Sequence, residues 1–222
     1  MIHVVICRYK ENATVIQEVI DALYSDNYKI FVYDRGEIKL ELKQLNCLNL
    51  IHIYDENIGR EEAPYLTHIV KNYHTLPEKI IFSQASIIDH KLQFEENESF
   101  SDWISFIKNT INLKFNSYIK KREPYYKGQY ITHASGVETI LKFIYKNNFN
   151  YSINNPLMFQ PAAIFAVSKN CIKNHDLSVY ETLLGVSVSK LNFGIFTKEN
   201  ITEFPWAIER CWETIFSKYN IT

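Results

Sequence analysis

The side chains best suited to bind an anion lie just after buried strands that the sequence predicts. Arg8 and Tyr9 follow the first of these strands, and Asp34 and Arg35 follow the second. The carboxyl ends of parallel strands meet at one edge of a sheet, and ligands of such folds bind there. Guanidinium groups form paired hydrogen bonds with phosphate and carboxylate oxygens. The sequence therefore predicts an anion-binding edge, against the alternative that polar loops occupy this edge in any α/β sheet.

A second cluster begins at Asn57 and continues along a helix predicted over residues 59–74. Gly59 permits a close turn, and the N-terminus of the helix offers free N–H groups and a positive dipole to an anion. Steps of three and four residues place four polar side chains on one helix face: Glu61, Tyr65, His68 and Asn72. This face is either a functional surface or the solvated stripe of an amphipathic helix.

Two further places carry groups that could do chemistry. Gln84 ends the fourth predicted strand, and Asp89 and His90 follow it. A carboxylate and an imidazole can bind a divalent cation, although two adjacent residues are also common in an ordinary loop. Glu209 lies in the last predicted helix among aromatic residues. It either pairs with a neighbouring cation such as Arg210 or serves as an acid or base.

The elements that position these residues alternate between strand and helix along the first ninety residues. Strands are predicted over residues 3–7, 29–33, 48–53 and 79–83, and helices over residues 13–24 and 59–74. Asn12 is placed to cap the first helix. This alternation predicts an α/β fold with a mostly parallel sheet and helices on both faces.

The second half of the chain is less regular. Helices are predicted over residues 101–111, 137–145, 177–184 and 206–219, a late core strand over 162–167, and a loop over 112–134. No repeat or linker divides the chain, so a single domain is expected.

Composition excludes several classes of protein. The 222 residues carry 24 Lys and Arg against 25 Asp and Glu, and 46% of them are apolar. A disordered chain would be less apolar, and bulk nucleic-acid binding would need a basic face. The four cysteines have no metal-site spacing, which favours buried thiols. No apolar stretch approaches the roughly 18 residues of a membrane span, and no signal peptide is recognised, so we expect a cytoplasmic protein. Common nucleotide, hydrolase and metalloprotease motifs are missing, including Asp-x-Asp after a strand.

Several segments together resemble a family of bacterial and fungal proteins, a domain of unknown function. They are VVICRYKEN, VYDRG, NIGREEAPYLTHIVKNYHTLPEKIIFSQASIIDH, AAIFAVSKNCI and IERCWETIF. The family shares Arg-Tyr, Asn-x-Gly-Arg-Glu and Phe-x-Gln blocks. The chain departs from the family at Ala85, where Gly is frequent, and at Ala163, where Gln is common, so no site role is carried to these positions.

The order of these blocks is similar to that of GT-A-type glycosyltransferases. The resemblance implies one GT-A-like domain over residues 1–222, with a nucleotide-binding half over 1–90 and an acceptor-side half over 91–222. It implies transfer of a sugar from a nucleotide-sugar donor to a surface glycan such as capsule or lipopolysaccharide. The alternatives are a non-catalytic carbohydrate- or anion-binding domain, and another enzyme that modifies capsule sugars by hydrolysis or amide formation. Peripheral association with a membrane is compatible with each of these functions.

The resemblance also implies roles for the residues above. Arg8 and Arg60 would hold the donor diphosphate, and Asp34 would contact the nucleoside. The remaining residues of the donor site would be Tyr9, Asn57 and Gly59. Gln84 would face the leaving group.

The resemblance leaves open whether a metal is used and which residue is the base that acts on the acceptor. Asp89 and His90 would bind Mn or Mg, or arginines would neutralise the diphosphate without a metal. Glu61 or Glu209 would be the base that acts on the acceptor, with His68 as the next candidate.

Overall fold

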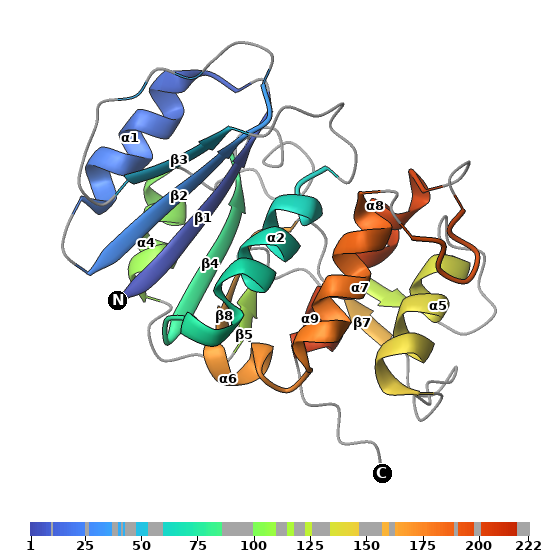
Figure 1. The fold of residues 1–222 in the computed structure, drawn as a ribbon. Coiled ribbons are helices and arrows are strands. Elements are labelled where there is room, and N and C mark those ends of the chain that lie inside the picture. Colours follow the sequence, from blue (N-terminus) through green and yellow to red (C-terminus); the bar gives the residue numbers. More distant parts are fainter. Residues whose placement is uncertain are drawn as a thin grey trace. The chain divides into compact units, whose positions relative to one another are not determined.

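The computed structural model describes most of the chain, and Figure 1 shows its elements. The described residues are 1–9, 11–24, 27–36, 40, 42, 48–52, 60–85, 100–109, 115–117, 123–125, 134–146, 157–159, 163–188, 191–197 and 201–216. They divide into two compact units. Unit 1 comprises Met1–Asn57, His74–Tyr118 and Ala163–Asn170, and unit 2 comprises Ile58–Tyr73, Ile119–Ala162 and Cys171–Thr222. The units interleave along the sequence, and the expected single domain with halves that meet near residue 90 stays a prediction.

Unit 1 is built on a six-stranded sheet in the order β3-β2-β1-β4-β8-β5. The strands are β1 (Ile2–Arg8), β2 (Tyr28–Asp34), β3 (Leu48–His52), β4 (Lys79–Gln84), β5 (Phe115–Ser117) and β8 (Phe165–Ser168). The first four run parallel to one another, whereas β8 pairs antiparallel with both β4 and β5. The predicted α/β class and mostly parallel sheet are therefore confirmed.

Apolar runs explain why these strands form the core of unit 1. Val4, Val5 and Ile6 of β1 are buried, as are Ile80 and Ile81 of β4. Continuous apolar runs are typical of strands that are covered on both faces. The sheet is accompanied by two helices, α1 (Ala13–Leu23) and α4 (Phe100–Asn109), which contact each other.

Helix α1 begins where the sequence predicts it. The side chain of Asn12 accepts a hydrogen bond of 2.9 Å from the N–H of Thr14, which confirms the predicted cap. Ile16, Ile20 and Leu23 are buried, and their spacing of three and four residues places them on one apolar face of the helix.

Unit 2 consists mainly of helices and a two-stranded antiparallel sheet. Its elements are α2 (Glu62–Asn72), β6 (Glu123–Tyr125), α5 (Ala134–Tyr145), β7 (Leu157–Phe159), α7 (Leu177–Ser187), α8 (Glu203–Glu209) and α9 (Trp212–Phe216). Helix α2 packs against α7 and α8, and α8 also packs against α5. A 3₁₀ turn (Tyr73–Thr75) and α6 (Lys169–Ile172) lie where the chain passes between the units. None of the helices in the described ranges is long and apolar enough to cross a membrane.

Two predictions about these elements were wrong. The loop predicted over residues 112–134 contains the strands β5 and β6, which are only three residues long and are defined by partners distant in sequence. The single helix predicted over 206–219 is broken after Glu209. At the break the N–H of Cys211 bonds to the carbonyl of Ile208 at 2.8 Å, a three-residue step that tightens the chain. Neither Gly nor Pro marks this break in the sequence. The break coincides instead with the burial of Cys211 and Trp212.

Candidate functional site

The strand order of unit 1 changes direction at β1. The chain adds β2 and β3 on one side of β1 and then places β4 on the other side. In open α/β sheets, ligands bind at the carboxyl ends of the strands beside such a reversal. Arg8 ends β1, Gln84 ends β4, and the N–H of Ala85 bonds to the carbonyl of Cys7 at 2.9 Å. The structure therefore brings together Arg8, Tyr9 and Gln84, as the sequence predicted.

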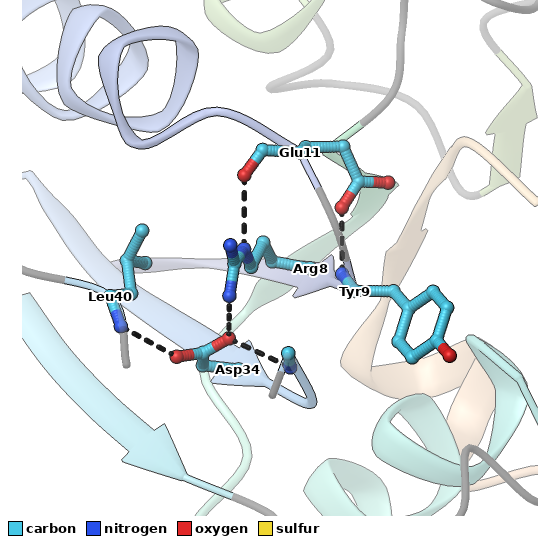
Figure 2. A network of polar contacts seen from close by, with 6 residues as sticks. Arg8, Tyr9, Glu11, Asp34 and Leu40 are labelled. Carbon is cyan, nitrogen blue, oxygen red and sulfur yellow. Dashed lines mark hydrogen bonds and ion pairs between the residues drawn. The ribbon is translucent and has the colours of Figure 1, made fainter. Parts of the chain in front are cut away.

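A buried ion pair joins the ends of β1 and β2. Arg8 and Asp34 are register partners, and Nη1 of Arg8 donates to Oδ1 of Asp34 at 2.7 Å. The side chains are 9% and 0% exposed, respectively. Nε of Arg8 also donates to the carbonyl of Glu11 at 3.0 Å (Figure 2). The guanidinium is thus fixed in orientation by two acceptors.

The carboxylate of Asp34 also orders the chain after β2. It accepts hydrogen bonds of 3.1 Å from the N–H groups of Gly36 and Leu40, one on each oxygen. The N–H of Arg35 bonds to the carbonyl of Arg8 at 2.9 Å. Asp34 therefore has a structural role at this edge, and its direct contact with a nucleoside stays a prediction.

A second carboxylate bonds to the backbone just after β1. The carboxylate of Glu11 accepts a hydrogen bond of 2.6 Å from the N–H of Tyr9 (Figure 2). The side chains of Tyr9 and Glu11 are both half-buried. At this edge the backbone N–H groups of Tyr9, Gly36 and Leu40 are therefore all bonded to carboxylates of the protein.

Gly36 is packed so closely against Arg8 that a larger residue should destabilise unit 1. A Cβ atom at Gly36 would lie 1.9 Å from Nη1 of Arg8 and 2.5 Å from the backbone oxygen of Tyr9. We expect Gly36→Ala to lower stability by about 1–3 kcal/mol, because the backbone oxygen cannot move aside cheaply. Thermal unfolding should show a fall in Tm of roughly 2–12 °C.

Gly185→Ala is the matched control for this substitution. The three atoms nearest to a Cβ at Gly185 all belong to the side chain of Leu191, which is exposed and can move. Because alanine also favours a helix over glycine, Tm should stay the same or rise. Equal Tm values for Gly36→Ala and the unchanged protein would contradict the tight packing on Arg8.

In unit 2, Arg60 lies just before α2 in a conformation that is rare for its residue type. Its φ is 38°, in the left-handed region that non-glycine residues seldom adopt. Its guanidinium carbon lies 4.2 Å from the ring centroid of Trp206. A cation over an indole face is an attractive contact. The stacking therefore offsets part of the backbone strain.

The start of α2 differs from the prediction. The helix begins at Glu62 rather than near residue 59, and Asn57 and Gly59 lie outside the described residues. Its first turn contains Pro64, which has no N–H to offer an anion. The carboxyl group of Glu62 lies in the same turn. In the part of this helix end that the structure describes, fewer backbone N–H groups are thus available to an anion than the sequence predicts.

Glu62 is the residue of this cluster that the sequence analysis missed. It is 1% exposed, and its Oε1 makes no hydrogen bond with any described group. Burial, followed by the charge of Glu61, raises the pKa of Glu62 well above its ordinary value. A signal was present, since Glu62 continues the spacing of four and three residues that joins Leu66 and Ile69 in the apolar stripe.

The polar face predicted along α2 is mostly a packing face. Tyr65 and His68 are buried, and the ring centroid of Tyr65 lies 6.4 Å from that of Trp212. The side-chain amide of Asn72 donates to the carbonyl of His68 at 2.8 Å. The solvated-stripe interpretation was therefore wrong for Tyr65 and His68, because this face packs within unit 2.

The remaining predicted residues divide between the described and undescribed parts. Glu61 and Glu209 are half-buried in unit 2. Asp89 and His90 lie outside the described residues, so their role as metal ligands stays a prediction. In the described ranges no group of three or more His, Cys, Asp or Glu residues could hold a metal ion.

Comparison with known families accounts for almost the whole chain. The family described as "Protein of unknown function (DUF3431)" matches residues 4–222. The chain belongs to this family. This agrees with the resemblance to a domain of unknown function and extends it through residues 95–155, which the recognised segments did not cover. A search of curated proteins finds no match. Membership of this family assigns no activity to the chain.

Proposed function

We propose that this DUF3431 protein is a GT-A-type glycosyltransferase, which moves a sugar from a nucleotide-sugar donor to a hydroxyl of a surface glycan. The nucleotide diphosphate would bind at the carboxyl edge of β1, β2 and β4 in unit 1. The observation that carries this proposal is the buried Arg8–Asp34 ion pair at this edge. An arginine that is already oriented by a carboxylate needs little rearrangement to bind an anion.

Two features of unit 1 support the proposal. Arg8 of this pair lies on β1, the strand at which the order reverses, and Arg35 follows Asp34 of β2 directly. Strand β8, which corresponds to the late core strand predicted over residues 162–167, pairs with β4 and is followed at once by α6. Both features concern the layout of the sheet, and the activity itself rests on the resemblance.

The transfer would replace one bond of the donor sugar. The bond between the sugar C1 and the diphosphate oxygen breaks, and a bond between C1 and the acceptor oxygen forms. The acceptor hydroxyl proton passes to a carboxylate, and the diphosphate leaves with its negative charge. The roles of Arg60, Glu61, His68, Gln84 and Glu209 stay predictions. Mn or Mg would neutralise the diphosphate if one of them binds.

Nucleotide binding can be measured by thermal shift. UDP, GDP, CDP and CMP should each be added with and without Mn or Mg. A ligand at about 100 times its Kd stabilises a protein by about 2.7 kcal/mol. For this chain length, we therefore expect one nucleotide to raise Tm by roughly 5–10 °C. A metal-dependent shift would favour the predicted role of Asp89 and His90.

Variants of unit 1 locate the binding site. Gln84→Ala should reduce the shift, because Gln84 ends β4 at the predicted edge. Gln17→Ala is the matched control, since the Gln17 side chain bonds to Asp21 along α1. A Tm that no nucleotide changes would contradict the transferase. A response to inorganic phosphate alone would favour an anion-binding domain.

A further inference from the structure

Trp206 is unusual among the tryptophans of this chain. Trp103 and Trp212 are buried, whereas Trp206 is 39% exposed on α8. Arg60 covers the ring at 4.2 Å, and Nη1 of Arg210 donates to the carbonyl of Trp206 at 2.7 Å. A large aromatic residue that is exposed yet held in place is a frequent feature of binding surfaces.

Carboxyl groups lie beside this tryptophan. Glu209 follows Trp206 by three residues, so the two share one face of α8. Helix α2 packs against α8, and the charges of Glu209 and Arg60 act on the buried carboxyl of Glu62. Oε1 of Glu62 has no hydrogen-bond partner in the described part of the chain. A buried polar atom of this kind calls for an explanation, and a bound ligand or ordered water would supply one.

The combination suits one chemical class of ligand. The C–H face of a pyranose ring packs on an indole, while its hydroxyl groups donate to carboxylates and accept from a guanidinium. The unusual backbone conformation of Arg60 is also of the kind that clusters at binding sites.

We propose that Arg60, Trp206 and Glu209 form a carbohydrate-binding site of unit 2. Glu209 is the carboxylate that contacts the sugar, and Glu62 is a positioning residue next to it. The site is an acceptor site only insofar as the proposed transferase function holds. It also favours Glu209 over His68 as the predicted base, because His68 is fully buried whereas Glu209 is half-exposed.

Sugar binding without a nucleotide tests this site. The probes are the methyl glycosides of glucose, galactose, mannose and N-acetylglucosamine at millimolar concentrations, followed by saturation-transfer NMR and tryptophan fluorescence. At least one should bind and change the fluorescence of Trp206. Trp206→Ala and Glu209→Gln should each weaken its binding about tenfold or more. Glu181→Gln is the matched control, since Glu181 is exposed on α7 and should leave the Kd unchanged.

The pH profile of binding tests the role of Glu62. When Glu62 ionises, its charge should attract the Arg60 guanidinium away from the Trp206 ring and weaken sugar binding as pH rises. In Glu62→Gln this weakening at high pH should disappear. If Glu62 only supported the fold, the substitution would leave the pH profile of sugar binding unchanged.

The outcomes separate this site from the nucleotide site. Failure of all four glycosides to bind would overturn the sugar site, even if a nucleotide still raises Tm. Binding that Trp206→Ala leaves intact would overturn its location. Glycoside binding that depends on Trp206, without any nucleotide response, would support the site and contradict the transferase.

Discussion

Replacement of Asp34 by alanine should lower the free energy of unfolding by about 3–5 kcal/mol, since it would leave the Arg8 guanidinium buried without its carboxylate. The N–H groups of Gly36 and Leu40 would also lose their acceptor. The corresponding fall in Tm is roughly 6–20 °C. Urea and thermal unfolding of the purified variant would measure both quantities.

An exposed ion pair in the same chain supplies the control. Lys142 and Glu138 lie one helical turn apart on α5 with an N–O distance of 3.6 Å, and the Lys142 side chain is mostly exposed. Glu138→Ala should change stability by only about 0.3–0.5 kcal/mol, because solvent screens such pairs. A double variant, Arg8→Met with Asp34→Leu, should recover most of the loss by removing both charges. Equal losses from Asp34→Ala and Glu138→Ala would contradict a buried pair.

Replacement of Glu62 by glutamine should make the protein more stable at high pH. The folded-state pKa of Glu62 is raised above its ordinary value of 4.5, so the folded state binds more protons than the unfolded state between the two pKa values. The stabilising effect of the protonated Glu62 carboxyl is complete below pH 4.5 and is lost as pH rises through the folded-state pKa. Within this window, stability should fall by up to about 1.4 kcal/mol per pH unit. Glutamine cannot ionise, so this slope should vanish in the variant.

Three charged groups near Glu62 act on its pKa. Arg60 and Glu61 precede α2, and Glu209 lies on α8; of these, the two carboxylates raise the pKa of Glu62 and Arg60 lowers it. Urea unfolding across a pH series should give equal stabilities for the variant and the unchanged protein near pH 4 and a growing difference above it. Glu181→Gln removes an exposed carboxylate on α7 and should show no such trend. A difference for Glu62→Gln that stays constant with pH would contradict the raised pKa.

The sequence by itself determined much of unit 1. Unbroken apolar runs placed β1, β2 and β4 within a residue or two of their ends, and Asn12 marked the start of α1. These features depend on local periodicity and capping, which neighbouring residues decide. The gathering of Arg8 and Asp34 at one edge also followed from the sequence, because parallel strands place their carboxyl ends together.

Only the tertiary structure decided the remaining features. The strands β5, β6 and β7 exist through their pairing with distant segments, and the final helix breaks where Cys211 and Trp212 become buried. Likewise, the sequence shows a glutamate at position 62, but the packing of α2 against α7 and α8 buries its carboxyl group and raises its pKa. The spacing of residues along the sequence determines which of them share a helix face, whereas burial of that face depends on elements far away in the chain.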